Sequence, residues 1–169
     1  EAARQYTLSV SQSCPATPGQ SEKQPLVIPL AMGLLGDAGN LPLQLQGEPA
    51  DIDTADNTHT VLKFDAAEQD FVFEDVGERP VPSLLRGFSA PVRLHYDYKR
   101  EDLRALMSRD GDGFVRWDSA QQLAISVIRD VESELASGAT GAVDALLLDA
   151  FADLLADESL DPAMVAEML

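Results

Sequence analysis

Few side chains in this sequence combine into a pattern that could catalyse a reaction. The two histidines, His59 and His95, are far apart in the chain, and neither belongs to an H-E-x-x-H motif. Catalytic zinc needs three protein ligands around one open position, which two distant histidines do not supply. The single cysteine, Cys14, follows a predicted strand and has no helix N-terminus beside it to activate its thiol. We therefore predict no catalytic, cofactor-binding or metal-binding residue in this chain.

The strongest candidate for ligand binding is the acidic segment 108–119, whose spacing is similar to that of a calcium loop. Asp110 and Asp112 fall at positions 3 and 5, and Gly113 occupies position 6, where such a loop turns sharply. Positions 1 and 12 are Ser108 and Ser119, so the first carboxylate and the bidentate glutamate are missing. The pattern therefore favours a polar loop between helices, and a calcium-binding module that uses Asp110 and Asp112 stays as the alternative.

Other suggestive residues fit structural roles better. The segment around Ser89, G-F-S-A-P, begins like the nucleophile elbow of a hydrolase but lacks the second glycine. Trp117 precedes a predicted helix, and we expect it to anchor the start of that helix in the core. Asp51, Asp53 and Asp56 have no basic or histidine partner nearby in the sequence. We expect these three aspartates to lie in a solvated loop.

Composition narrows the class of protein. The 169 residues include 12 Lys and Arg against 29 Asp and Glu, a net charge of −17. Nucleic acids and anionic membrane surfaces attract clustered basic residues, so neither is an expected partner. No apolar run is long enough for a membrane span. A hydrophobic content of 45% allows a buried core, and one cysteine without a disulfide partner favours a reducing compartment, the cytoplasm.

The first hundred residues alternate between apolar and polar side chains with the period of half-buried strands. Turn residues such as Pro18-Gly19 and Asp37-Ala38-Gly39-Asn40 separate the alternating segments. About seven short strands without helical periodicity between them are typical of a β-sandwich. The predicted strands are 5–11, 25–35, 41–46, 59–64, 70–75, 83–88 and 91–98.

Helical periodicity begins near residue 100. Leu103, Leu106 and Met107 share one helix face, and Asp118 is expected to begin a second helix that ends before Gly138. A third helix is predicted over 143–155, and Asp161-Pro162 has the residue types of a helix N-cap and first turn. The pattern predicts a β-sandwich over 1–99 followed by a small all-α segment over 100–169. We expect the apolar helix faces to dock on the sandwich or on further helices.

Both ends suggest an excised piece of a larger protein. The chain begins with Glu1 and not with a start methionine, and its first predicted strand begins almost at that terminus. Its last predicted helix reaches Leu169 without a terminating residue. We therefore expect the reactive residues of the whole protein to lie outside this sequence.

Three blocks of the sequence are similar to the bacterial aminopeptidase N family, the zinc-dependent alanyl aminopeptidases of gluzincin type. Residues 5–29, with Q-Y-T-L and P-A-T-P-G-Q, resemble the start of the family's immunoglobulin-like domain. Residues 71–92, with P-V-P-S-L-L-R-G-F-S-A-P-V, resemble its last strands. Residues 110–121, D-G-D-G-F-V-R-W-D-S-A-Q, resemble the junction with the C-terminal helical domain.

The resemblance implies a parent enzyme of four domains, of which this chain supplies the third and the start of the armadillo-like fourth. It also implies that the zinc ligands, the glutamate that polarises water and the catalytic tyrosine lie upstream. No residue here matches them, and Tyr6, Tyr96 and Tyr98 take no such role. The expected partners are the missing domains, with peptide substrates bound only by the parent. A free-standing immunoglobulin-like binding module with an acidic helical tail stays as another alternative.

Overall fold

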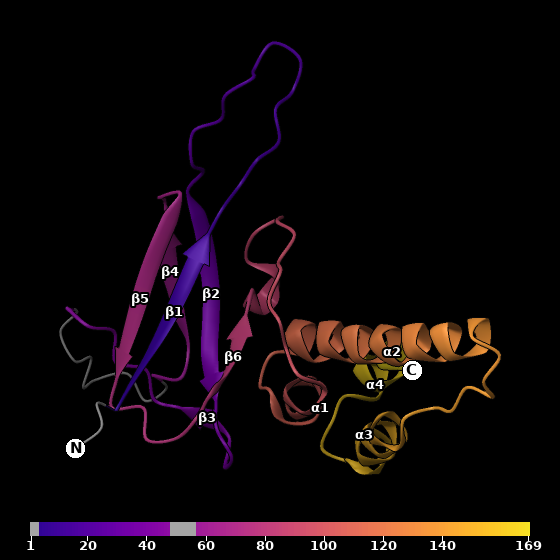
Figure 1. The fold of residues 1–169 in the computed structure, drawn as a ribbon. Coiled ribbons are helices and arrows are strands. Elements are labelled where there is room, and N and C mark those ends of the chain that lie inside the picture. The colour runs from indigo at the N-terminus through magenta and orange to yellow at the C-terminus, as the bar shows by residue number, and fades with distance from the viewer. Residues whose placement is uncertain (1–3, 48–56) are drawn as a thin grey trace. The chain divides into compact units, whose positions relative to one another are not determined.

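The computed structural model describes residues 4–47 and 57–169, which form two compact units, Glu1–Val92 and Arg93–Leu169 (Figure 1). Strands make up the first unit and helices the second, as the change of period near residue 100 predicts.

The first unit consists of two antiparallel sheets. Strand β1 (Gln5–Ser11) pairs with β5 (Glu68–Glu74), and Leu8 lies opposite Phe71. In the second sheet β2 (Ile28–Leu35) pairs with β3 (Asn40–Leu41), β4 (Thr60–Phe64) and β6 (Val81–Leu84). Both sheets contribute buried side chains to one core, which makes the unit a β-sandwich. The most buried members of this core include Leu8, Leu30, Met32, Leu34, Phe64 and Phe73.

The last part of the predicted strand pattern is wrong. The segment 91–98 contains no strand, and 83–88 is replaced by β6 and a 3-10 turn over Arg86–Phe88. Leu85 and Phe88 have φ angles of 56° and 53°, which extended strands do not adopt. The prediction for 41–46 shrinks to β3 and one isolated bridge between Leu45 and Phe73. The described residues thus contain six strands.

Four helices build the second unit. They are α1 (Arg100–Arg109), α2 (Gly113–Ala136), α3 (Ala145–Ala156) and α4 (Pro162–Met168). Asp161 caps α4 by accepting a hydrogen bond from the Ala163 N–H, as its position before Pro162 predicts. Gly138, with a φ of 86°, follows the end of α2, where the left-handed conformation favours glycine.

The core of the helical unit lies between α1, α2 and α3, with Met168 of α4 against it. Leu123 is fully buried at its centre. Ile128 and Leu135, which the sequence places on the same apolar face as Leu123, are 54% and 56% exposed. None of the helices in the two described ranges has the length and apolar character to cross a bilayer.

The start of α2 differs from the prediction. Asp112 rather than Asp118 is the N-cap, and its side chain accepts a hydrogen bond of 2.9 Å from the Val115 N–H. Asp118 lies within the helix and accepts from the Gln122 amide instead. Both aspartates can cap a helix, and the earlier one succeeds because its carboxylate reaches a free N–H of the first turn.

Candidate functional site

The sandwich contains a buried arginine that the sequence analysis did not single out. The Arg86 side chain donates hydrogen bonds to Ser83 Oγ (2.7 Å), the Asn40 side-chain oxygen (3.0 Å) and the Thr58 carbonyl (3.1 Å). Its guanidinium lies where a Cβ atom on Gly33 would be, so any side chain at this position in β2 would displace the guanidinium. A glycine in the middle of an apolar strand is the sequence signal for such a close approach.

A second arginine connects three helices of the other unit. Arg100 donates to the Ser126 hydroxyl and carbonyl, both at 3.0 Å, and forms ion pairs with Asp130 (2.5 Å) and Asp144 (3.0 Å). An arginine in the first turn of a helix opposes the helix dipole, which makes Arg100 unfavourable there without acidic partners. The network thus holds the start of α1 against α2 and the N-cap of α3.

Asp144 has two stabilising partners that favour its charged form. Its carboxylate accepts a hydrogen bond from the Leu146 N–H at the start of α3 and pairs with Arg100, and together they lower the pKa of Asp144 below its ordinary value. Asp157 at the end of α3 has a lowered pKa because the Ser159 hydroxyl and N–H donate to it. These carboxylates give the helical unit a pH dependence.

A lowered carboxylate pKa predicts a stability loss in acid. Because the folded-state pKa of Asp144 lies below the ordinary value of 3.8, the stabilisation is complete well above that pH. It is lost as the pH falls through the lower folded-state value. Asp144→Asn keeps a capping oxygen but removes the charge, so we expect less loss of stability between pH 7 and pH 3 than in the parent sequence.

Urea titrations of the helical circular dichroism at several pH values measure this effect. The matched control is Glu158→Gln, at an exposed side chain. In this variant the free energy of unfolding should fall between pH 7 and pH 3 as much as it does in the unchanged sequence. If Asp144→Asn left this pH dependence of the unfolding free energy unchanged, the stabilising role assigned to the Asp144 carboxylate would be wrong.

The segment that is similar to a calcium loop serves as a connection between helices. Asp110 accepts a hydrogen bond of 2.8 Å from the Asp112 N–H, and Asp112 caps α2. Because α2 begins at Gly113, the second half of the pattern is helical and cannot wrap around an ion as a calcium loop does. This arrangement agrees with the favoured prediction of a polar loop between helices.

Arg116 is buried in the first turns of α2 and is 7% exposed. One Nη atom donates to the Asp110 carbonyl at 3.3 Å, while Nε and the other Nη have no hydrogen-bond partner among the described residues. Burial lowers the pKa of Arg116, and the charges of Asp157 and Asp110 act in the opposite direction. Desolvation outweighs the charges of the two aspartates, which offset only part of its effect on the pKa of Arg116.

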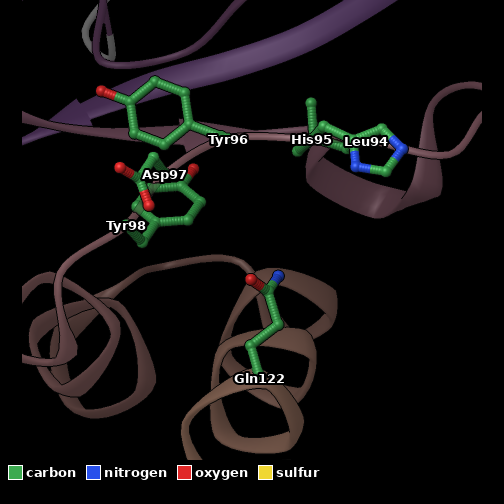
Figure 2. Close-up of a pocket in the computed structure, with 6 residues that line it drawn as sticks. All are labelled: Leu94, His95, Tyr96, Asp97, Tyr98 and Gln122. Atoms are coloured by element: carbon green, nitrogen blue, oxygen red, sulfur yellow. The ribbon is translucent and has the colours of Figure 1, made fainter. Parts of the chain in front are cut away.

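The helical unit has a surface depression of about 500 Å³, which is lined by the segment that leads into α1 (Figure 2). Tyr96, Asp97 and Tyr98 follow one another along its wall, and the Gln122 side chain points towards them from α2. The tyrosine rings lie 4.4 Å apart between centroids. His95 also lines the depression, but it shares no hydrogen bond with Asp97 in the described structure.

The remaining candidates are dispersed. His59 is exposed beside β4, and Cys14 is exposed in the connection between β1 and β2. The Ser89 hydroxyl accepts a hydrogen bond from the Ala31 N–H at 3.0 Å, which is a structural role. Trp117 lies inside α2 and is 38% exposed, so the predicted buried anchor before the helix is wrong. Asp51, Asp53 and Asp56 lie outside the described residues.

Histidine, cysteine, aspartate and glutamate side chains do not gather into a metal site in the ranges 4–47 and 57–169. No group of three or more of them is close enough to hold an ion there. The residues that the structure describes therefore do not fit the zinc that the family resemblance implies for the parent.

The architecture is thus an immunoglobulin-like sandwich followed by helices of the armadillo type. Residues 1–97 match the family model described as a domain of unknown function (DUF3458) with an Ig-like fold. Residues 100–169 match its C-terminal companion (DUF3458_C), described as ARM repeats.

Relatives with the same two parts are aminopeptidases. Aminopeptidase N of Escherichia coli (strain K12) is 43% identical over 166 residues, which are 98% of this chain and 18% of that protein. Aminopeptidase N of Haemophilus influenzae is 41% identical over 73% of this chain and 14% of its own length. A crystal structure of Legionella pneumophila aminopeptidase A in complex with aspartic acid has a TM-score of 0.72 at 31% identity, over 98% of this chain and 16% of that one.

The chain belongs to the DUF3458 family and corresponds to the Ig-like and C-terminal helical parts of aminopeptidase N. It spans less than a fifth of the length of the curated relatives that it matches.

Proposed function

We propose that this chain is a non-catalytic part of a zinc-dependent aminopeptidase that removes N-terminal residues from peptides. The observation that carries the proposal is the 43% identity to aminopeptidase N over nearly the whole chain, which covers only 18% of that relative. The dispersed candidate residues described above agree with a reactive centre elsewhere in the parent. We place the parent in the cytoplasm, in line with the one cysteine of this chain, Cys14, which is exposed and has no disulfide partner here.

The proposed role of the chain is that of a rigid connection between the catalytic domain and the rest of the helical domain. Each unit has its own buried core, and an arginine network braces each of them, a buried one around Arg86 and a partly exposed one around Arg100. Such bracing suits a support that must hold other domains in a fixed geometry, because site geometry depends on rigid surroundings. We place the boundary between the two domains at residues 99 and 100, directly before α1.

The separately produced chain should hydrolyse no alanyl anilide and should retain no stoichiometric zinc after metal-free purification. The parent protein, purified in the same way and reloaded with zinc, should bind the metal and hydrolyse the anilide, because it supplies the metal ligands and the catalytic groups. Metal analysis and a chromogenic assay on both proteins measure this difference. Turnover that follows the chain through every purification step would refute the proposal, and so would a parent without zinc-dependent activity.

A further inference from the structure

The connection between β1 and β2 forms an arm that extends beyond the strands of the sandwich (Figure 1). We call residues 12–27 the β1–β2 arm. Nearly all of its residues are exposed, including two neighbouring apolar side chains, Leu26 (57%) and Val27 (65%). A segment of this length that packs so little against its own domain costs conformational entropy to hold in place.

Side-chain hydrogen bonds nevertheless hold the arm at its base. The Gln12 amide donates to the carbonyls of Leu26 (2.9 Å) and Ala66 (2.8 Å), and its oxygen accepts from the Leu26 N–H (2.8 Å). The Gln12 N–H also donates to the Ala67 carbonyl at 2.9 Å. One glutamine thus joins both ends of the arm and connects them to the turn between β4 and β5.

The tip is also held in one conformation. Thr17 and Gln20 exchange two backbone hydrogen bonds of 2.9 and 3.0 Å around Pro18-Gly19. Proline followed by a glycine with a φ of 81° is the residue pattern of a type II turn. The Lys23 ammonium donates to the side-chain oxygens of Thr17 (2.8 Å) and Gln20 (2.7 Å) and closes the tip. The arm is therefore preorganised although its own domain does not cover it.

The composition of the arm is that of a protein contact. Only Glu22 and Lys23 among its 16 residues are charged, whereas charged residues make up 24% of the whole chain. The centres of protein interfaces are depleted of charge in the same way. A second copy of this chain is an unsuitable partner because its net charge of −17 repels another such molecule.

We propose that the β1–β2 arm docks into a weakly charged, partly apolar groove on another part of the same parent polypeptide, outside residues 1–169. The relatives supply that occupant, because more than four-fifths of their length lies outside the matched segment. A preorganised arm binds without a large ordering cost, which suits a permanent contact between domains. This inference rests on the proposed function, since it requires the longer parent.

Cys14 provides a natural probe in the arm, because its thiol is exposed in this structure. In the native parent we expect N-ethylmaleimide to alkylate Cys14 at least about tenfold more slowly than in the urea-unfolded parent, as for other groups covered by a stable contact. Peptide mass spectrometry follows Cys14 separately from any other cysteine. Ala16→Glu adds a charge to the arm and should restore rapid alkylation, whereas Thr7→Glu on the exposed face of β1 should not.

An active parent in which Cys14 reacts as rapidly as in the unfolded protein would overturn the docking proposal while leaving the proposed function intact. Protection that disappears on dilution would also overturn it, because a second copy would then cover the arm. A parent without zinc-dependent peptidase activity would instead refute the proposed function. Alanyl-anilide turnover is measured on the same samples to separate these results.

Discussion

Replacing Arg86 with methionine is expected to lower the free energy of unfolding of the sandwich by about 2–5 kcal/mol. Methionine fills part of the space, but Ser83, Asn40 and Thr58 each lose the hydrogen bond that the guanidinium donates. Ser83 is fully buried and would carry the full cost of having been removed from water, whereas Asn40 and Thr58 are partly buried and would carry less of it. Hydrogen exchange of the β2 amides under native conditions measures the loss.

Gly33 allows a sharper form of this experiment. Gly33→Ala alone places a Cβ atom against the Arg86 guanidinium and should also destabilise the sandwich. In the Arg86→Met background that obstacle is removed, so the two changes should cost less together than the sum of their separate effects. Lys63→Met, at a side chain 73% exposed on β4, is the control and should stay within about 0.5 kcal/mol. Additive effects at Arg86 and Gly33 would show that their contact is unimportant.

Leu123→Ala is expected to destabilise the helical unit by about 2–5 kcal/mol. Leu123 is fully buried on α2 between α1 and α3, so the change removes apolar contacts and leaves a cavity. Trp117, the single tryptophan, lies on the same helix and reports unfolding of this unit by fluorescence in urea.

Ile128→Ala is the matched control because Ile128 lies on the same helix but is 54% exposed. It should change the unfolding free energy by about 0.5 kcal/mol or less, as surface substitutions do. Equal losses at Leu123 and Ile128 would contradict the position assigned to the core. They would also mean that the exposed face of α2 is covered in solution.

Local patterns predicted most of the elements. Alternation located β1 at 5–11, the bounds that it has in the structure. Helical spacing located α1, α2 and α3, and the Asp161-Pro162 pair located α4. Boundaries were less certain where two residues have the same local preference. Asp112 and Asp118 are both suitable N-caps, and only the position of the Val115 N–H decides between them. The segment 91–98 alternates like a strand but pairs with no strand among the residues that the structure describes.

The family resemblance was readable without coordinates, and so was the absence of an H-E-x-x-H motif from this sequence. Family membership is recognised from blocks of residues in a fixed order along the chain. Catalytic motifs are recognised from particular residue types separated by a few positions. Neither depends on which residues meet in space.

Only the tertiary structure showed which polar groups are buried and what they bind. Arg86 acquires its role from Ser83, Asn40 and Thr58, which folding brings together from three separate parts of the sandwich. Arg100 similarly meets residues of α2 and the cap of α3. Local periodicity reports which face of an element is apolar, whereas the burial of a charge depends on contacts between elements distant in the chain. For that reason the supporting networks appeared only in the folded protein.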